Sequence, residues 1–288
     1  MECFEDNFII GKSHIYITAE IGINHNGDLA IAKELIKKSK EAGVDAVKFQ
    51  KRSIDIVYTE EMLNKQRESP WGTTQREQKE GLEFSLDEYS EINSYCKEIE
   101  IDWYASAWDI PSQDFLNNFD LRVNKIASAM TTNLEFVERV ASEGKPTFIS
   151  TGMCTYEEIK NAVDVFNNKK CRFVLMHTNS EYPSREEKLN LNVISTLKDK
   201  FNCNVGYSGH ESSVSPSLVA SALGAVSIER HVTLDRSMYG SDQAASLEYV
   251  GIKNLVTTIR KLNIILGNGE KEITEVEHEV AKKLRYWE

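Results

Sequence analysis

Eight short runs of apolar and β-branched residues, separated by longer amphipathic stretches, constrain the fold of this chain more than any other feature of its sequence. The expected strands are residues 15–21, 46–50, 102–107, 122–127, 147–151, 172–177, 204–207 and 226–231. Alternation of this kind is typical of parallel sheets whose strands are joined by helices. Eight such units, with no Gly-x-Gly-x-x-Gly sequence after the first strand, favour a closed α/β barrel, the (β/α)8 TIM barrel, over an open doubly wound sheet.

The intervening stretches have helical spacing. Asp28 can cap the first helix, and Gly43 can end it. Between them, one apolar face is expected to contain Leu29, Ala32, Leu35, Ile36 and Ser39. Further helices are expected at residues 87–99, 134–143, 156–167, 187–200, 213–223 and 246–266.

Nothing in the sequence indicates a linker between domains. It has only five prolines and no low-complexity stretch, so we expect one domain over residues 1–288, with an extra helix at about 273–286. A long insert, residues 52–83, follows the second strand and includes Ser69-Pro70-Trp71-Gly72. A lid, a contact between subunits and a plain solvent loop all agree with its length.

Composition excludes several classes of function. The net charge of −11 argues against a nucleic-acid-binding surface, which needs clustered Lys and Arg. Residues 1–10 are acidic and do not resemble a secretory signal, and no apolar run is long enough to span a membrane. The five cysteines are scattered and lack a Cys-x-x-Cys pair. We therefore expect reduced thiols and a cytoplasmic protein.

Polar residues follow nearly every expected strand. In a barrel, the carboxyl ends of the strands meet at one face, which is where active sites are built. The residues expected there are Glu20, Lys48, Gln50, Ser106, Lys125, Ser128, Ser150, Thr151, His177, Ser180, Ser208, His210, Glu229 and His231.

Two chemistries are suggested by this set. Lys48 and Lys125, with nearby serine hydroxyls, could bind a small anion, although each serine could equally be a turn former. His210 and His231 end adjacent strands and could bind one metal ion, since neutral imidazole suits Mn, Fe, Co or Zn. A structural role is the alternative for each histidine.

Six motifs carry a resemblance to a known family. They are residues 19–28 (AEIGINHNGD), 48–51 (KFQK), 150–153 (STGM), 206–211 (GYSGHE), 229–235 (ERHVTLD) and 240–248 (GSDQAASLE). Together they resemble the sialic acid synthases over about residues 15–267. The insert and residues 82–85 (LEFS) look closest to the branch that contains the animal 9-phosphate synthases.

The resemblance implies a reaction and a set of roles. Family members condense phosphoenolpyruvate with an N-acylmannosamine, or its 6-phosphate, to give a nonulosonic acid and phosphate. By resemblance, a divalent metal (Mn, Mg or Co) at His210 and His231 polarises the sugar aldehyde, and the enzyme is a homodimer. The catalytic set would then be Glu20, Lys48, Lys125, His210, His231 and Asp242, and the substrate-binding set Gln50, Ser106, Ser128, Ser150, Ser180, Tyr182 and Ser208.

The chain departs from the family pattern at two places. Met130 stands where many relatives have a glutamate that could activate water, so Glu20, a substrate phosphate oxygen or another group is left for that task. Longer relatives add an antifreeze-like domain that lends an arginine to the sugar site, and these 288 residues contain no counterpart. We therefore expect weaker discrimination for the N-acyl group, unless Arg67 or Arg76 of the insert replaces that arginine.

Two other functions agree with the same residues. A metal-dependent sugar isomerase or hydrolase could use His210, His231, Glu20 and Glu229, and a non-catalytic sugar-phosphate sensor could keep the barrel alone. The paired lysines favour the synthase. The identity of the aldehyde and its phosphorylation stay open at this point.

Overall fold

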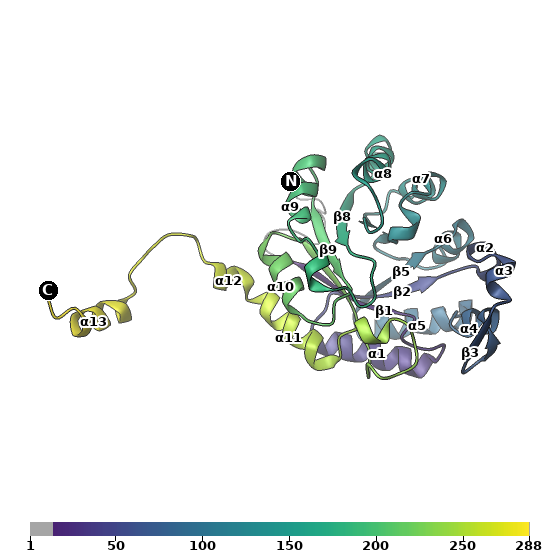
Figure 1. Ribbon diagram of the computed structural model, residues 1–288, viewed down its shortest axis with the longest axis horizontal. Helices are drawn as coiled ribbons and strands as arrows, with labels where there is room; N and C mark the ends of the chain where they lie inside the picture. The colour runs from purple at the N-terminus through teal and green to yellow at the C-terminus, as the bar shows by residue number, and fades with distance from the viewer. Residues whose placement is uncertain (1–13, 288) are drawn as a thin grey trace.

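Eight parallel strands form a closed barrel, as the sequence predicts (Figure 1). The computed structural model describes residues 14–287. The barrel order is β1-β10-β9-β8-β7-β6-β5-β2, so the first and last strands lie side by side. The strands are β1 (Tyr16–Gly22), β2 (Ala46–Lys51), β5 (Asp102–Ala107), β6 (Asn124–Ile126), β7 (Thr147–Ser150), β8 (Phe173–Thr178), β9 (Val205–Gly209) and β10 (Ser227–His231).

Helices cover the outside of this barrel (Figure 1). They are α1 (Leu29–Ala42), α5 (Leu86–Glu98), α6 (Ile110–Leu116), α7 (Leu134–Ala141), α8 (Tyr156–Asn168), α9 (Val193–Phe201), α10 (Ser215–Ala222) and α11 (Tyr249–Arg260). The expected ends of α1 are confirmed. The Asp28 side chain accepts from two backbone N–H groups, and Gly43 has a φ of 89°, a conformation that favours glycine.

Three helix predictions need correction. The helix expected from residue 187 begins at Val193, because a 3₁₀ turn (Glu186–Lys188) and the left-handed Asn190 interrupt it. The helix expected at 246–266 begins at Tyr249, since Leu247 instead forms a β-bridge with Val232, and a second helix, α12 (Leu262–Leu266), follows it. Helix α6 was not in the predicted set, although its Asp109 cap and the proline near its start are typical helix signals.

Strand alternation divides the inside of the barrel into two layers. Side chains two residues apart on a strand face the same side. The lower layer is aromatic: Tyr104 and Tyr16 stack on Phe148, with ring centroids 6.0 and 5.8 Å apart. Two residues further along β5 and β7 come Ser106 and Ser150, in the layer that opens at the carboxyl ends of the strands. A packed apolar floor therefore supports a polar site.

The insert between β2 and α5 is folded, so it is not the plain solvent loop that its length allowed. It contains α2 (Ile54–Val57), α3 (Glu60–Leu63), a hairpin of β3 (Gln66–Ser69) and β4 (Gly72–Thr74), and α4 (Gln75–Glu80). Gly27 and Gly81 come so close that a Cβ on Gly27 would lie 2.0 Å from the Gly81 carbonyl oxygen. The His25 ring stacks on Phe84, directly after the insert, with centroids 4.1 Å apart. The motif at 19–28 thus seats the insert beside the barrel mouth.

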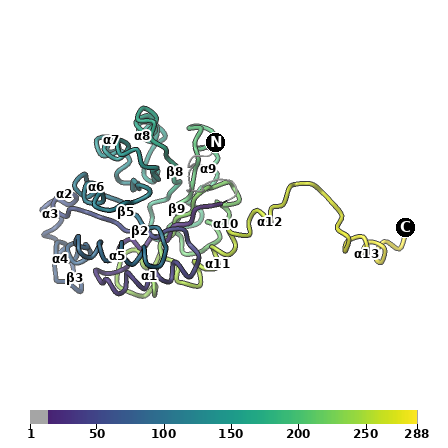
Figure 2. The backbone as a smooth tube through the Cα atoms, turned by 180° about the vertical axis from the view of Figure 1, so that it is seen from behind, coloured from purple at the N-terminus to yellow at the C-terminus, as the bar shows by residue number. Residues whose placement is uncertain are grey.

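The C-terminal segment leaves the barrel. The extra helix predicted at 273–286 is confirmed as α13 (Glu275–Leu284), which a Thr274–Glu277 capping box begins. Figures 1 and 2 show α13 lying away from the barrel in both views. Its Val276, Val280 and Leu284 side chains are exposed.

Two expectations about compartment can be compared with the described residues. Within residues 14–287 no helix has both the length and the apolar character that crossing a membrane requires. Cys96, Cys154 and Cys171 take part in no disulfide among the described residues. The expectations for Cys3 and for residues 1–10 fall outside the described residues.

Candidate active site

A cavity of about 180 Å³ opens at the carboxyl ends of the barrel strands. Of the residues assigned to the site from the sequence, those that line this cavity are Glu20, Lys48, Gln50, Ser106, Lys125, Ser128, Ser150, Ser180, Tyr182, Ser208, His210 and His231. Asp242 does not line it, but its Oδ2 lies 3.7 Å from His231 Nδ1. The wall also includes six residues outside that assignment: Trp108, Ala127, Ala129, Met153, Thr178 and Glu229.

Buried charges alternate in sign on the cavity floor. Lys48 Nζ lies 2.9 Å from Glu20 Oε2 and donates to Ser106 Oγ at 2.9 Å. Lys125 Nζ lies 3.3 Å from Glu229 Oε2, and Lys48 Nζ lies 3.7 Å from Glu229 Oε1. Two ammonium groups thus share two carboxylates, which compensates for the cost of burying each charge.

This arrangement shifts the pKa values of its members in different directions. Burial lowers the pKa of Lys125, more than the Glu229 carboxylate raises it. Burial also acts to lower the pKa of Lys48, but Glu20 and Glu229 together raise it. Burial acts to raise the pKa of Glu229, yet Lys125 and Lys48 hold it well below its usual range. The pairing therefore favours the carboxylate form of Glu229 and the ammonium form of Lys48, while burial acts against the ammonium form of Lys125.

Glu229 is the residue that the sequence-based assignment missed. It was expected only at a strand end and as part of the isomerase alternative. In the structure it contacts both lysines and accepts from Ser208 Oγ at 3.1 Å. A signal was present: Glu229 lies two residues before His231 on β10, so strand alternation places the two side chains on the same face.

A second group of donors lies across the cavity from the histidines. Ser128 Oγ accepts from the Gly152 N–H at 3.1 Å. A Cβ on Gly152 would lie 2.3 Å from Ser180 Oγ and 2.8 Å from Ser128 Oγ, so only glycine lets these hydroxyls approach each other here. Lys125 Nζ, which donates to Ser150 Oγ at 2.6 Å, adds a charged donor beside these hydroxyls. Hydroxyls beside a lysine suit a phosphate or carboxylate group.

His210 and His231 meet on the other side, with ring centroids 5.3 Å apart. His210 Nδ1 donates to the Asn179 carbonyl at 2.6 Å, which leaves the Nε2 lone pair to accept from the Tyr182 hydroxyl at 2.9 Å. Burial, and then the neighbouring His231, lower the pKa of His210 to about 3. His210 is therefore neutral at physiological pH, the form that binds metals.

The two histidines fit a divalent metal. The Nδ1 of His231 is buried and makes no hydrogen bond within the described residues, so it has an unused polar atom. The His210 ring is oriented by a backbone carbonyl, as metal-binding imidazoles usually are. Residues 14–287 hold no group of three His, Cys, Asp or Glu side chains that could bind a metal without help. Oxygen ligands from water or substrate would have to complete the coordination.

An ion pair behind the cavity fixes the two strands that carry these histidines. Arg230 and Glu211, each next in sequence to one histidine, are fully buried and lie 3.0 Å apart through Nη1 and Oε1. Glu211 also accepts from the Tyr207 hydroxyl at 2.8 Å, and Arg230 donates to Ser217 Oγ at 3.0 Å. The glutamate of the 206–211 motif and the arginine of the 229–235 motif are therefore structural.

The 240–248 motif is held over β1 by a polar network. Asn24 Nδ2 donates to the Val232 carbonyl and to Ser246 Oγ, both at 2.8 Å. Thr233 Oγ1 donates to Gln243 Oε1 from the other side. This network positions Asp242 beside His231.

Known proteins share both the sequence and the fold. The NeuB family model matches residues 35–271. The chain is 37% identical to the N-acetylneuraminate-9-phosphate synthase of Mus musculus over 287 residues, covering 99% of this chain and 80% of that protein. It is 36% identical to the N,N'-diacetyllegionaminic acid synthase of Legionella pneumophila, covering 94% of this chain and 78% of that protein. The solved structure of N-acetylneuraminic acid (sialic acid) synthetase from Leptospira borgpetersenii, in complex with citrate, superimposes with a TM-score of 0.84 at 31% identity, over 97% of this chain and 96% of the other.

The closed barrel and the polar cavity at its strand ends define a TIM-barrel enzyme. Within that class, the chain belongs to the NeuB family, that of the sialic acid synthases. The resemblance inferred from the six sequence motifs is confirmed.

Proposed function

We propose that this protein joins phosphoenolpyruvate to an N-acylmannosamine-type sugar aldehyde, forming a nonulosonic acid and releasing phosphate. It is a phosphoenolpyruvate-dependent condensing enzyme, like the synthases to which it is similar. One observation carries the assignment: a single cavity holds two buried lysines beside serine hydroxyls on one side and two buried histidines on the other. An isomerase or a hydrolase needs no such anion pocket.

The anion side of the cavity accommodates phosphoenolpyruvate. Lys125 and Ser150, with the Ser128 and Ser180 hydroxyls next to Gly152, would bind the phosphate and carboxylate groups. Their positions are fixed before substrate arrives, because Glu229 holds the lysines and Gly152 leaves room for the serines. Preorganised donors of this kind stabilise developing charge without reorganising during the reaction.

The histidine side faces the aldehyde. His210 and His231 would hold the divalent ion, for which we propose Mn, Mg or Co. When bound, such an ion polarises a carbonyl oxygen and makes its carbon more electrophilic. Asp242, beside His231, and Tyr182, on His210, would contact the sugar. Carbon 3 of the enol then attacks the aldehyde carbon from the lysine side.

Water must add to carbon 2 before phosphate leaves. Met130 packs against the hydrophobic core and is not among the cavity-lining residues, so it takes no part. The two carboxylates that line the cavity are Glu20 and Glu229. Because Glu229 contacts both lysines whereas Glu20 contacts only Lys48, we assign water activation to Glu20, whose Oε1 accepts from Gln50 Nε2 at 2.8 Å.

Phosphate release from phosphoenolpyruvate, measured with added metal and a panel of aldoses, tests the assignment. We expect release only with an acylmannosamine-type sugar, and mass spectrometry should detect the nine-carbon product. His210→Ala and His231→Ala should each abolish release while the circular dichroism spectrum is unchanged, and chelator should have the same effect. Sugar turnover without phosphoenolpyruvate would instead indicate the isomerase or hydrolase, and binding without any turnover the sensor.

We also propose a cytoplasmic homodimer. The free thiols at Cys96, Cys154 and Cys171 support a reducing compartment. The exposed apolar face of α13, which nothing in residues 14–287 covers, supports association with a second copy.

A further inference from the structure

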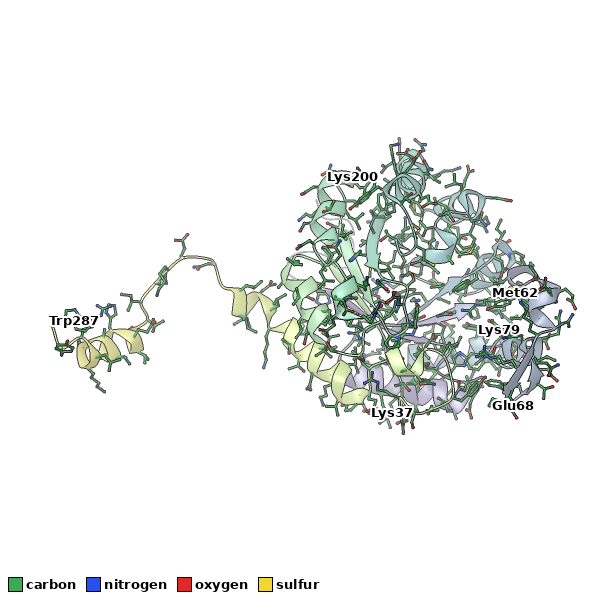
Figure 3. The ribbon with its side chains drawn as sticks, viewed as in Figure 1. Lys37, Met62, Glu68, Lys79, Lys200 and Trp287 are labelled. Carbon is green, nitrogen blue, oxygen red and sulfur yellow. The ribbon has the colours of Figure 1, made fainter. Side chains whose placement is uncertain are left out.

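The folded insert carries three cations, the first of which contacts the cavity wall through Trp108. Arg52 follows β2 directly, Arg67 lies on β3, and Lys79 lies on α4. Arg67 reaches Gln75 at the start of α4, and Lys79 lies one helical turn further along that helix. The charges of Arg52 and Arg67 both act on the Lys79 ammonium. Figure 3 labels Lys79 on the same side of the barrel as Met62 and Glu68, which belong to the same insert.

Two of these cations have no carboxylate of their own. Within residues 14–287, neither Arg67 nor Lys79 forms an ion pair; Arg67 Nη1 reaches only the Gln75 amide oxygen, at 3.5 Å. The Lys79 ammonium lies 5.1 Å from the centre of the Tyr58 ring. Unpaired cations of like charge repel one another, so a group of them without an anion is costly unless a ligand supplies the negative charge.

Arg76 of the same insert shows the contrast. Its guanidinium pairs with Asp55 at 2.6 Å, Glu60 at 2.8 Å and Glu80 at 3.3 Å. Its charge is therefore shared with three carboxylates of the insert, so Arg76 is less available to a substrate than Arg67. The unpaired state of Arg67 and Lys79 is a local feature and not a general property of the insert.

The third cation is partly paired and connects the group to the active site. The Arg52 guanidinium stacks on Trp108, with its carbon 4.5 Å from the ring centre, and Trp108 lines the cavity. One of its nitrogens donates to Gln50, which in turn donates to Glu20 at 2.8 Å. Glu83 lies 3.5 Å from another nitrogen, but the Arg52 Nε is buried without a hydrogen bond in the described residues.

Two further contacts locate these cations relative to His210 and His231, the proposed metal-binding pair. The insert contacts the loop that carries Asp242, because the Trp71 ring packs edge-on against Tyr239 with centroids 5.8 Å apart, and Asp242 lies beside His231. The charge of Asp242 also acts on the Lys79 ammonium. The cations therefore lie on the sugar side of the cavity, away from the Lys125 pocket that takes phosphoenolpyruvate. An anionic group carried at the far end of the sugar would point toward them.

We propose that Arg52, Arg67 and Lys79 bind the terminal phosphate of a phosphorylated sugar, so that the preferred aldehyde is an N-acylmannosamine 6-phosphate. The proposal names the substrate class of the proposed reaction and rests on it. The phosphate on carbon 6 takes no part in bond making or breaking, and is kept on carbon 9 of the product. A phosphate dianion matches this group of three cations better than a neutral hydroxyl, which would leave their repulsion uncompensated.

The test compares N-acetylmannosamine with its 6-phosphate. We expect the wild-type enzyme to have the higher kcat/KM with the 6-phosphate. Lys79→Met and Arg67→Ala should each lower that value about ten- to a hundredfold, the usual effect of one lost charge-assisted hydrogen bond, and change the value for the free sugar less than about twofold. Lys79→Met keeps the alkyl chain over Tyr58, so a folded variant is expected, and Lys79→Arg should restore most of the preference.

Arg76→Ala is the matched control, since it removes a cation of the same insert whose charge is already paired. It should leave the preference unchanged. Equal use of the two sugars by the wild-type enzyme, or equal losses on both sugars in Lys79→Met and Arg67→Ala, would overturn the proposal.

Binding of mannose 6-phosphate, measured by calorimetry, separates this proposal from the reaction itself. Heat of binding that disappears in Lys79→Met, in a protein that releases no phosphate with any sugar, would support the phosphate site and overturn the synthase assignment. Turnover with acylated sugars together with no Lys79-dependent binding would retain the synthase and overturn the phosphate site.

Discussion

The Glu20 and Glu229 carboxylates lie against the Lys48 and Lys125 ammonium groups, so acidic and basic groups are equal in number on the cavity floor. Phosphoenolpyruvate is a multiply charged anion, and lysines that are already paired with carboxylates attract it less than unpaired lysines would. A divalent cation held by His210 and His231 would supply additional positive charge.

Metal removal should therefore weaken phosphoenolpyruvate binding as well as stop turnover. Equilibrium titration of the wild-type enzyme with phosphoenolpyruvate, with and without chelator, measures this. We expect the affinity to fall at least about tenfold on chelation, and His231→Ala to bind as weakly as the chelated enzyme, with no further loss on adding chelator. Unchanged affinity would mean that the lysines alone hold the anion.

Among the lysines, Lys125 should contribute most to phosphoenolpyruvate binding. It is buried, and it contacts Ser150 within the proposed anion pocket. Lys125→Ala should raise the KM for phosphoenolpyruvate and reduce kcat/KM about ten- to a hundredfold, as expected for a lost charge-assisted contact. Lys37→Ala, on the exposed face of α1 (Figure 3), is the control and should have no effect. Similar small changes in both variants would contradict the pocket.

Lys79 should make the use of a phosphorylated sugar depend on pH. Burial, then Arg52 and Arg67, lower the pKa of Lys79 to about 8, against the opposing attraction of Asp242 and Glu83. The ammonium is the form that binds phosphate, so affinity should be full below this pKa and fall as the pH rises through it. The KM for the 6-phosphate should therefore rise between pH 7.5 and 9, flanking that pKa of about 8. The KM for the free sugar serves as the control over the same range.

The same pH series in Lys79→Arg gives a sharper comparison. Arginine stays protonated throughout this range, so the rise in KM should disappear. If the rise persists in that variant, another group is responsible.

At the scale of elements, strands β9 and β10 are joined by more than their backbone ladder. The Arg230–Glu211 pair is fully buried and ties both strands to Ser217 of α10. Removing one partner would leave an uncompensated charge inside the protein. This pair fixes the strand ends from which His210 and His231 project.

Glu211→Ala should therefore destabilise the fold by about 3–5 kcal/mol, the usual cost of breaking a buried ion pair. Urea denaturation followed by circular dichroism measures the change. Glu61→Ala, which breaks the exposed pair with Lys65, should cost less than about 1 kcal/mol. A change of the same small size in Glu211→Ala would mean that the pair contributes little to the fold.

The barrel could be predicted from sequence because its strands are short apolar runs and its helices have clear caps. Asp28 and Gly43 mark both ends of α1 by local chemistry alone. The start of α9 could not be found this way, because a left-handed Asn190 interrupts a run with helical spacing. Strand alternation likewise predicted most of the residues that line the cavity. Glu229 was missed because its role depends on lysines from two other strands.

The cation group of the insert could not be predicted as a group, although Arg67 was named as a candidate for the sugar site. Arg52 follows β2, Arg67 lies on β3 and Lys79 lies on α4, so the three are well separated along the chain. They come together only because the hairpin and α4 fold back on the 19–28 loop, where Gly27 meets Gly81. Sequence gave equal weight to Arg76, whose pairing with three carboxylates depends on the same tertiary fold.

At the scale of the whole molecule, the barrel and the C-terminal segment differ in how far their apolar side chains are buried. The barrel buries its large apolar residues in one cluster. Helix α13 instead exposes Val276, Val280 and Leu284, four residues apart and so on one helical face, at 74%, 44% and 69% of their surface. An isolated helix of ten residues is marginal in water, so packing against another surface would stabilise it.

The proposed homodimer gives that face a partner. Val276→Asp and Val280→Asp place charges on the apolar face, and should shift the protein from dimer to monomer in size-exclusion chromatography with light scattering. Lys282→Ala, which changes a 73% exposed lysine outside that row, is the control and should leave the dimer intact. Since α13 lies away from the barrel (Figures 1 and 2), the monomeric variants should keep the circular dichroism spectrum of the folded barrel, which shows that the change is in association. A wild-type monomer at micromolar concentration, or a dimer unaffected by either aspartate, would mean that α13 does not hold two copies together.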